Sequence, residues 1–247
     1  MMQKNKHKIL DNLKKKISVI VPCYNESKTI EKIINRVSRT NLNLEIIIID
    51  DYSIDGSRDI IKKIKNKHVK KKIFHKKNMG KGACIKSSIK YITGEIVLIQ
   101  DADLEYNPRD YKKLLKPFQN ENICVVYGSR VLNKKRYSLE KDLPTNFRVF
   151  SNHVLTLLSN FINFQLLTDA HTCYKLFKSK LFFQLKPSEN DFAFCPEVTT
   201  KISNLKIKIH EVPISYNGRG YDEGKKIGIY DAIRVVLVLM KYKFFKK

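Results

Sequence analysis

Ile96-Val-Leu-Ile-Gln-Asp-Ala-Asp-Leu-Glu-Tyr106 is the stretch of this sequence that predicts most about its fold. The four apolar residues at its start are typical of a strand buried on both faces. The carboxylates of Asp101 and Asp103 need partners or water, so we expect the chain to reach the surface directly after this strand. Alternation along an extended backbone sends both carboxylates to the same side. Such a pair suits a hard divalent cation that keeps positions open for phosphate oxygens, and an ordinary acidic turn is the alternative.

The sequence before this stretch alternates between strand-like and helix-like patterns. Apolar runs predict strands at 17–22, 45–49, 69–75 and 96–99, with helices between them. Apolar strands joined by helices imply a parallel sheet that is covered on both faces, and ligands of such sheets bind beyond the carboxyl ends of the strands. Polar loops follow all four strands, at 24–26, 50–53, 78–82 and 101–105. Four loops are thus expected at one edge, which an isolated acidic turn does not predict.

The second half of the sequence predicts a less regular arrangement. Helices are predicted over 108–118, 147–164 and near 196–202, and strands over 123–127 and 207–213. Residues 133–143 are charged and predict a mobile loop. The helix at 147–164 is so apolar that we expect it to pack in the core, with a place beside a lipid-binding groove as the alternative.

The composition indicates a globular intracellular protein. The chain has 247 residues, of which 43% are hydrophobic, enough for one large domain with a real core. Five scattered cysteines without any CxxC pair argue against a zinc site or a disulfide framework and favour a reducing compartment. No signal peptide is recognisable, and no stretch approaches the roughly 20 apolar residues that span a bilayer. We therefore expect a cytoplasmic location.

The formal net charge of +24 favours anionic partners. Nucleic acid, phosphorylated substrates and an anionic membrane surface would all qualify, and a codon bias toward lysine and asparagine would produce the same excess without any partner. The basic residues are spread over the whole chain and no nucleic-acid-binding module is recognisable, so no nucleic-acid partner is expected.

Several motifs in order resemble the family 2 glycosyltransferases of the GT-A fold. They are Val21-Pro-Cys-Tyr-Asn-Glu26, Asp50-Asp-Tyr-Ser-Ile-Asp-Gly56, Asn78-Met-Gly-Lys-Gly82, Gln100-Asp-Ala-Asp-Leu-Glu-Tyr106, Tyr127-Gly-Ser-Arg130, Thr172-Cys-Tyr-Lys175, Glu211-Val-Pro-Ile-Ser-Tyr216 and Glu223-Gly-Lys-Lys-Ile227. Within that family they look most like the polyprenyl-phosphate glycosyltransferases of the dolichyl-phosphate mannose synthase type. The resemblance implies a Rossmann-like three-layer α/β/α domain with a mostly parallel sheet over 17–216. A basic tail (1–16) would precede it, and a basic loop with an amphipathic helix (217–247) would follow.

The resemblance also implies roles for individual residues. The nucleotide sugar would be bound by six of them: Pro22, Tyr24, Glu26, Asp51, Lys81 and Asp101. Mg²⁺ or Mn²⁺ would be held by Asp101, Asp103 and Glu105. The phosphate of the acceptor would be bound by Arg130, Lys175, Arg219 and Lys225. Asp103, Arg130 and Arg219 would be the catalytic residues, because metal, guanidinium and ammonium groups all stabilise phosphate charge.

The implied reaction is an inverting transfer of a hexose from a donor of the GDP-mannose or UDP-glucose type to dolichyl or undecaprenyl phosphate. A phosphate monoester has its second pKa near ~6, so the nucleophile is already ionised and needs no general base. Transfer to a glycan hydroxyl in surface polysaccharide synthesis is an alternative that requires a base carboxylate. A non-catalytic nucleotide-binding module and a basic membrane adaptor are alternatives from other classes.

Residues 227–245 predict a C-terminal helix that bears on location. Apolar side chains share one face of it and basic side chains lie nearby: Ile229, Ile233, Val236, Leu237 and Met240, with Arg234, Lys241, Lys243, Lys246 and Lys247. This pattern fits a helix lying on an anionic membrane, and packing against the catalytic domain or a partner is the alternative. We expect a peripheral protein at the cytoplasmic face of a membrane, reached by this helix or through a membrane-anchored partner protein.

Overall fold

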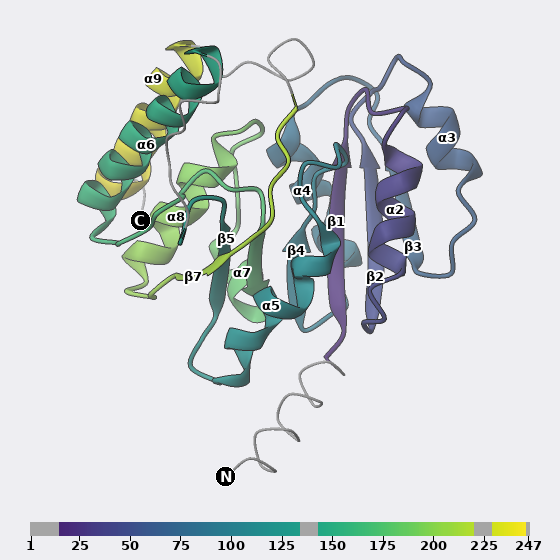
Figure 1. Ribbon diagram of the computed structural model, residues 1–247, viewed down its shortest axis with the longest axis horizontal. Coiled ribbons are helices and arrows are strands. Elements are labelled where there is room, and N and C mark those ends of the chain that lie inside the picture. The colour runs from purple at the N-terminus through teal and green to yellow at the C-terminus, as the bar shows by residue number, and fades with distance from the viewer. Residues whose placement is uncertain (1–14, 134–142, 220–228, 246–247) are drawn as a thin grey trace.

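A seven-stranded sheet forms the centre of the structure, a computed structural model that describes residues 15–133, 143–219 and 229–245 (Figure 1). The order of strands across the sheet is β3-β2-β1-β4-β6-β5-β7. Their bounds are β1 (Ile17–Cys23), β2 (Leu44–Asp50), β3 (Val69–Phe74), β4 (Ile96–Ile99), β5 (Val125–Ser129), β6 (Lys175–Lys178) and β7 (His210–Pro213). The first four strands lie where the sequence predicts them, to within one residue at each end.

The sheet is mostly parallel. β1 lies between β2 and β4 and pairs in parallel with both, and β3 continues this parallel set beside β2. β6 runs antiparallel to β4 and β5, and β7 is parallel to β5. Every residue of β2 and β4 is buried, which explains why these strands are apolar almost throughout. The prediction of an α/β protein with a mostly parallel sheet is confirmed.

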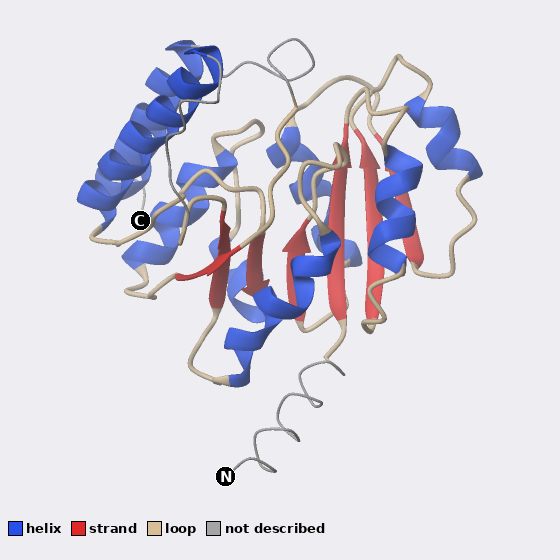
Figure 2. Cartoon of the chain, viewed as in Figure 1, coloured by secondary structure: helices blue, strands red, loops and turns tan. Residues whose placement is uncertain are grey.

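Helices cover both faces of the sheet (Figure 2). The α-helices are α2 (Ile30–Ser38), α3 (Ser57–Lys63), α4 (Lys81–Ser88), α5 (Tyr111–Leu115), α6 (Leu143–Asn163), α7 (Ser179–Leu185), α8 (Phe194–Asn204) and α9 (Ile229–Met240). Short 3-10 helices are η1 (Ile89–Tyr91), η2 (Pro108–Asp110) and η3 (Lys116–Gln119), and a π-helical turn, η4 (Lys241–Phe245), follows α9. α2 buries Ile30, Ile33, Ile34 and Val37, the residues whose helical spacing is visible in the sequence.

Three predicted elements differ from the observed ones. The helix predicted at 108–118 is divided into η2, α5 and η3, and α5 ends at Leu115 because Pro117 has no backbone N–H to continue an α-helix. The strand predicted at 123–127 lies at 125–129, where Gly128 pairs with Val212 of β7. A Cβ atom on Gly128 would lie 2.9 Å from a side-chain carbon of Ile214, so this strand packs more closely than a larger residue allows. The last strand is shorter than predicted and begins at His210.

α6 and α9 form a helical pair beside the sheet (Figure 1). Leu155 of α6 packs against Val235 and Leu239 of α9 in a small core of its own. The prediction that the apolar helix at 147–164 lies in the core is therefore half correct, since one side of α6 is buried and the other is exposed. Most of the charged stretch 133–143 lies outside the described residues.

Candidate active site

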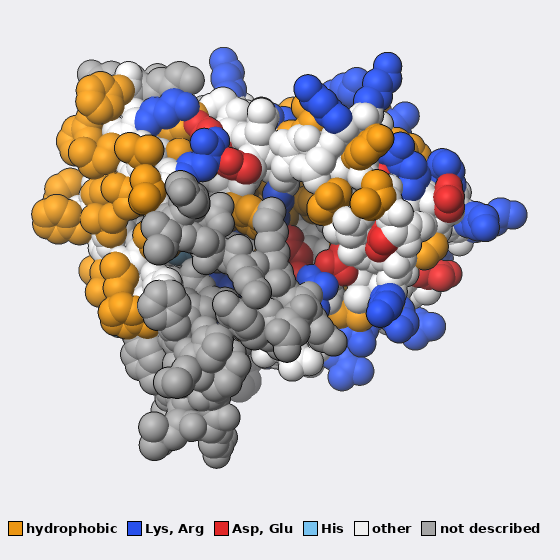
Figure 3. Space-filling view, turned by 90° about the horizontal axis from the view of Figure 1, so that it is seen from above, with side chains coloured by type: hydrophobic (Ala, Val, Ile, Leu, Met, Phe, Trp, Pro, Cys, Tyr) orange, Lys and Arg blue, Asp and Glu red, His pale blue; other side chains and the backbone are white. Residues whose placement is uncertain are grey.

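The loops at the carboxyl ends of β1 and β2 are joined to each other. The backbone N–H of Asn25 donates to Ser53 Oγ at 3.0 Å, and the N–H of Ile54 donates to Asn25 Oδ1 at 2.9 Å. Asn25 takes a left-handed conformation (φ 54°), which asparagine tolerates better than most residues. Figure 3 looks onto this edge of the sheet and shows acidic side chains inside a hollow near its centre. The predicted meeting of loops at one edge is thus present.

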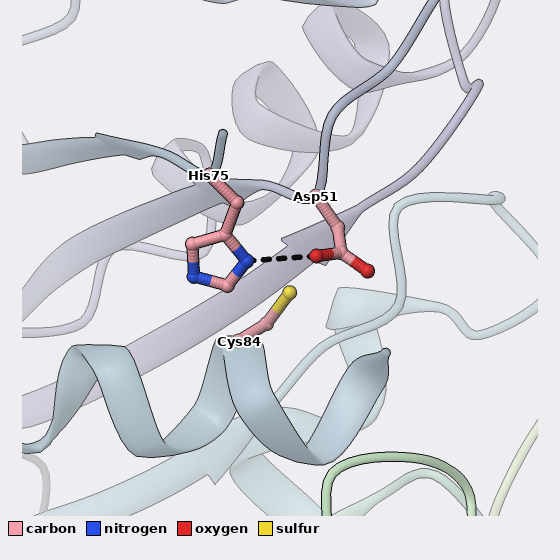
Figure 4. A group of neighbouring side chains, drawn as sticks. All are labelled: Asp51, His75 and Cys84. Atoms are coloured by element: carbon pink, nitrogen blue, oxygen red, sulfur yellow. Dashed lines mark hydrogen bonds and ion pairs between the residues drawn. The ribbon is translucent and has the colours of Figure 1, made fainter. Parts of the chain in front are cut away.

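Asp51 is buried under the glycine-bearing loop (Figure 4). Its carboxylate accepts hydrogen bonds from His75 Nδ1 at 2.7 Å and from the backbone N–H groups of Met79 at 2.9 Å and Gly80 at 2.7 Å. The Cys84 thiol is a fourth hydrogen-bond partner, so the roughly four acceptor positions of this carboxylate are filled inside the protein. Asp51 therefore fixes the loop at 78–82, and its contact with a base or ribose stays a prediction.

Asp51, His75 and Cys84 lie close enough together to suggest a metal site. His75 uses both ring nitrogens elsewhere, because Nδ1 contacts Asp51 and Nε2 lies 2.8 Å from Ser87 Oγ. Burial raises the pKa of the Cys84 thiol, and the negative charge of Asp51 raises it further. A protonated thiol and an engaged imidazole are poor metal ligands. This group acts as a hydrogen-bond network that positions Asp51.

The loop at 78–82 packs directly on the segment around Asn190. The N–H of Ala83 donates to the carbonyl of Asn190 at 2.8 Å. A Cβ atom on Gly80 would lie 2.6 Å from the same carbonyl oxygen, and one on Gly82 would lie 2.3 Å from the carbonyl oxygen of Glu189. Only glycine fits at either position, and Gly80 also has a positive φ of 94°.

Lys81 and Asp101 form an ion pair at the centre of the site. Lys81 Nζ lies 2.5 Å from Asp101 Oδ1, and both side chains are largely buried. Burial alone would lower the pKa of Lys81, but the charge of Asp101 outweighs it and holds the pKa well above the usual range. Lys81 and Asp101, both predicted to bind the nucleotide sugar, therefore neutralise each other in this structure.

Arg219 joins the early and late parts of the chain at the same place. Its Nη2 lies 2.7 Å from Glu26 Oε1 and 3.4 Å from Asp103 Oδ2. Its backbone N–H donates to Glu105 Oε1 at 3.0 Å. Residues 193 positions apart in sequence thus form one ion pair across the hollow.

Four carboxylates and two cationic groups make up what we call the acidic cluster: Glu26, Asp101, Asp103, Glu105, Lys81 and Arg219. Two formal negative charges therefore remain uncompensated. Burial raises the pKa of Asp103 to about 7, and repulsion from Asp101 and Glu105 adds to the effect. Carboxylates with excess negative charge are the ligands that a hard divalent cation such as Mg²⁺ or Mn²⁺ prefers. In the described part of the chain, however, the oxygens of Asp101, Asp103 and Glu105 do not come within 4.8 Å of one another as a set, so the predicted metal ligands are neighbours without ligand spacing in this structure.

Glu105 and Tyr216 hold the late loop against this cluster. Tyr216 donates its hydroxyl hydrogen to Glu105 Oε2 at 2.7 Å, and the N–H of Asn217 donates to the carbonyl of Glu105 at 2.9 Å. Tyr216 also pairs with Tyr106 in an isolated β-bridge. Glu105 thus has a positioning contact beyond the metal-binding role that the sequence predicts for it.

Arg130 is held by a two-pronged contact with Asp169. Arg130 Nε and Nη2 donate to the two carboxylate oxygens of Asp169 at 2.7 and 2.8 Å. Burial would raise the pKa of Asp169, but Arg130 outweighs burial and lowers it. The guanidinium also lies over the ring of Tyr216, at 5.2 Å from its centroid. Arg130 is therefore rigidly oriented beside the late loop.

Lys175 does not reach the predicted acceptor site, and this is a correction. Its side chain is fully buried, and Nζ donates to the carbonyls of Ala170 at 2.9 Å and Thr172 at 2.7 Å. The ammonium also lies 4.0 Å from the ring centroid of Tyr127. Because the Lys175 ammonium makes its polar contacts inside the protein, it stabilises the turn at 169–175 and is not available to bind the acceptor phosphate.

The remaining predicted residues lie at the edge of the hollow or outside the described chain. Tyr24 is 47% exposed, so its ring is open to a ligand. Pro22 lies in β1 opposite Ile49 of β2. Lys225 lies outside the described residues. The sequence does not predict that His75 is a partner of Asp51, since no spacing pattern indicates that side chains at the ends of two neighbouring strands are in contact.

Comparison with known proteins gives the family. The model of glycosyl transferase family 2 matches residues 18–185. The chain belongs to this family. It is 26% identical over 257 residues to a dolichyl-phosphate beta-glucosyltransferase of Trichomonas vaginalis, covering 96% of this chain and 76% of that protein. It is 27% identical over 252 residues to the UDP-N-acetylglucosamine–dolichyl-phosphate N-acetylglucosaminyltransferase of Methanococcus voltae, covering 94% and 98%.

Solved structures confirm the GT-A fold of this glycosyltransferase. Glucosyl-3-phosphoglycerate synthase of Mycobacterium tuberculosis, in complex with Mn²⁺, UDP and glucosyl-3-phosphoglycerate, matches with a TM-score of 0.68 at 18% identity. The match covers 98% of this chain and 84% of that one. A complex of the same enzyme with Mg²⁺ and UDP matches with a TM-score of 0.69. The fold that the motifs imply is therefore the observed fold.

Proposed function

We propose that this glycosyltransferase moves a hexose from a nucleotide sugar to the phosphate of a polyprenyl phosphate, with inversion at the anomeric carbon and with Mg²⁺ or Mn²⁺ as cofactor. The acidic cluster carries the proposal. It combines an excess of carboxylate with Lys81 and Arg219, which is the arrangement that a metal-bound diphosphate requires. The names of the two relatives, both of which act on dolichyl phosphate, support the acceptor.

Donor binding is assigned to the first half of the chain. The open ring of Tyr24 would contact the base, and Asp51 would exchange its contact with the Cys84 thiol for a hydrogen bond from the base or ribose. Lys81 would exchange its contact with Asp101 for a donor phosphate. UDP sugars are the first donors to test, because the Methanococcus enzyme is named for UDP-N-acetylglucosamine and the solved relatives contain UDP.

The metal would be held by Asp101 and Asp103, with Glu105 beside them. Bound there, a divalent cation would act as a Lewis acid that stabilises charge on the leaving diphosphate. Burial raises the pKa of Asp103 most and repulsion from Asp101 and Glu105 adds to it, and a bound cation would stabilise the ionised carboxylate against both. The solved relatives that contain Mn²⁺ or Mg²⁺ together with UDP support the assignment.

The acceptor phosphate is assigned to Arg130 and Arg219. Arg130 keeps one guanidinium nitrogen, Nη1, outside its contact with Asp169, and Arg219 lies directly at Asp103. Two guanidinium groups would orient the phosphate and lower its repulsion from the donor diphosphate. Since the phosphate oxygen is already ionised, the chain needs to supply no general base.

Membrane association is part of the proposal. Two rows of exposed apolar side chains repeat at the same helical spacing and form what we call the apolar face: Phe150, Val154, Leu157 and Phe161 of α6, and Ile233, Leu237, Met240 and Phe244 of α9 and η4. Figure 3 shows hydrophobic side chains gathered over these helices, to one side of the hollow. A contiguous apolar surface of this kind marks a membrane or protein contact.

We assign the apolar face to the cytoplasmic surface of a membrane, where a polyprenyl phosphate would be available. Among the described residues, none of the helices has the length and apolarity that crossing a bilayer takes. Residues 17–216 would then form the catalytic domain and 217–247 the basic loop and membrane-contacting helix, with α6 as a second contact. A membrane-anchored partner protein could cover the same face.

The deciding experiment is a transfer assay that forms lipid-linked sugar. Purified protein is given UDP-glucose, UDP-N-acetylglucosamine or GDP-mannose with dolichyl or undecaprenyl phosphate, in Mn²⁺, Mg²⁺ or EDTA. We expect metal-dependent product with at least one pair, and at least a hundredfold loss in Asp103→Asn. Transfer to oligosaccharides but not to the lipid phosphate would favour the hydroxyl-acceptor alternative. Nucleotide binding without any product, unaffected by Asp103→Asn, would favour a non-catalytic module.

A further inference from the structure

A second cavity lies at the opposite edge of the sheet from the acidic cluster. It has a volume of about 1230 Å³ and is lined by the ends of α6, α7 and α8 and by η4. Residues 207–209 line it just before β7 begins, whereas the site at Arg219 follows the other end of β7. This cavity, which we call the basic groove, is therefore separate from the donor and acceptor sites described above.

The basic groove carries a strong positive charge. Among the residues that the structure describes, five lysines line it and no carboxylate does: Lys186, Lys201, Lys206, Lys208 and Lys243. Lys201 Nζ lies 2.6 Å from Oε1 of Glu197, a buried residue that does not line the groove. Within the described chain, Lys186, Lys206 and Lys208 have no ion-pair partner, and all three are exposed.

Helix ends explain part of this charge but not all of it. α6, α7 and α8 end at Asn163, Leu185 and Asn204, all of which line the groove. Each helix C-terminus carries about half a negative charge, so the three together offset roughly one and a half lysines. Glu197 offsets one more. An excess of about two and a half positive charges is left, which is enough to neutralise a phosphate group.

The backbone places two of these lysines in unusual positions. Lys186 and Lys206 have positive φ angles of 42° and 57°, a conformation that glycine or asparagine normally supplies after a helix. Both side chains line the groove.

The groove opens onto the apolar face. Phe164 and Leu166 line the groove and are 88% and 96% exposed, directly after the row of apolar side chains on α6. Lys243 Nζ lies 5.3 Å from the ring centroid of Phe164, so charge and apolar surface meet at this point. A ligand that fits both would carry an anionic group and an apolar chain.

We propose that the basic groove binds the phosphate-bearing headgroup of an anionic phospholipid, while the acyl chains lie along Phe164, Leu166 and the apolar face. This inference rests on the proposed position at a membrane but not on the transfer reaction. The membrane contact then has two parts. The apolar face buries hydrophobic surface in the membrane, and the basic groove makes binding stronger on membranes that contain anionic lipid.

The test compares vesicle binding by the full chain and by two matched double variants. K206Q/K208Q removes two groove lysines, and K32Q/K67Q removes two exposed lysines of the other end of the sheet that have no ion pair among the described residues. Binding is measured by cosedimentation with phosphatidylcholine vesicles with and without 30 mol% phosphatidylglycerol, a fraction of about a third chosen to give strong surface charge. Circular dichroism confirms that each variant folds.

On the vesicles that contain phosphatidylglycerol, K206Q/K208Q should reduce partitioning tenfold or more and K32Q/K67Q less than threefold. Both should bind pure phosphatidylcholine vesicles as the parent does. Equal losses in the two variants would overturn the proposal, since charge alone would then explain binding. A parent dimer in sedimentation velocity that K206Q/K208Q abolishes would assign the groove to a second copy of the chain.

Sugar transfer in detergent micelles separates this proposal from the function itself. K206Q/K208Q should retain the parent KM for polyprenyl phosphate, because the groove lies apart from Arg130 and Arg219. A selective rise in that KM would overturn the proposal by making the groove part of the acceptor site. Failure of the parent to transfer any sugar would refute the proposed function, and the vesicle comparison would still decide the groove.

Discussion

Asp103→Asn should stabilise the metal-free protein while it abolishes transfer. Burial and the neighbouring carboxylates raise the pKa of Asp103 from 3.8 to about 7. In the unfolded chain the same carboxyl titrates near its ordinary value. Above pH 7 the folded protein therefore contains an ionised carboxylate that its surroundings disfavour. Asparagine removes the charge and keeps an oxygen that can accept the N–H of Glu105.

The size and pH dependence of this effect follow from the pKa difference. The rise in the pKa of Asp103 from 3.8 to about 7 corresponds to about 4 kcal/mol, at 1.36 kcal/mol for each pKa unit. Because Asp101 and Arg219 readjust when the charge is lost, we expect a gain of about 2–4 kcal/mol, or roughly 5–10 °C in Tm. Both forms are equal below pH 4, where Asp103 is protonated in the folded and the unfolded chain. The gain grows from pH 4 to pH 7 and is constant above it.

Differential scanning fluorimetry in EDTA between pH 4 and pH 8 measures this gain, and a Mn²⁺ titration at pH 8 completes the test. Mn²⁺ should raise the Tm of the parent, because it binds the folded state, and should leave Asp103→Asn nearly unchanged. Asp59→Asn is the control, since this carboxylate is exposed and pairs only with Lys62. An Asp103→Asn protein that melts below the parent at pH 8 in EDTA would refute the reasoning.

Three further substitutions test other parts of the site. Lys175→Met should lower the free energy of unfolding by about 2–3 kcal/mol, because two buried carbonyls lose their donor. Urea unfolding measures this change. A variant of unchanged stability with a raised KM for the acceptor would show instead that Lys175 binds the acceptor phosphate. Gly82→Ala places a Cβ 2.3 Å from the carbonyl oxygen of Glu189, so it should both lower the urea midpoint and raise the donor KM, and a variant with neither change would contradict the close packing. Arg130→Lys loses the two-pronged contact with Asp169 and should reduce kcat/KM for the acceptor tenfold or more, whereas parent-like kinetics would exclude a phosphate contact.

The first half of the fold could be predicted from the sequence because its strands are buried on both faces. β4 is apolar throughout and β2 contains the apolar run Ile46–Ile49, and each run ends within one residue of the end of its strand. The sequence predicts a strand at 123–127, two residues before the observed β5, because Gly128 and Ser129 are typical of a loop. Only their pairing with β7 in the folded protein makes them part of the strand. β6 is not among the strands that the sequence predicts, and its direction is not predictable either, since a short strand pairs either way.

The candidate site shows the same division between local and distant contacts. Alternation along a strand predicts that Asp101 and Asp103 lie on one side of the chain, but β4 ends at Ile99 and Asp103 lies in a turn, so strand alternation does not position these side chains. Lys175 has the composition of a phosphate ligand, but its burial is decided by where the turn at 169–175 folds back, which no spacing pattern records. The pairing of Arg219 with Glu26 likewise joins two ends of the chain.

The Glu26–Arg219 pair connects the two halves of the proposed reaction. Glu26 follows β1 on the donor side, and Arg219 belongs to the late loop that Glu105 and Tyr216 hold in place. Arg219 also lies 3.4 Å from Asp103, where a metal-bound diphosphate would bring additional negative charge. The Arg219 guanidinium has three carboxylate neighbours, Glu26, Asp103 and Glu105. It can therefore leave Glu26 and contact the bound phosphate with only a small movement. The late loop is thus positioned by the same carboxylates that would hold the donor, so donor binding and acceptor binding would share one charged group.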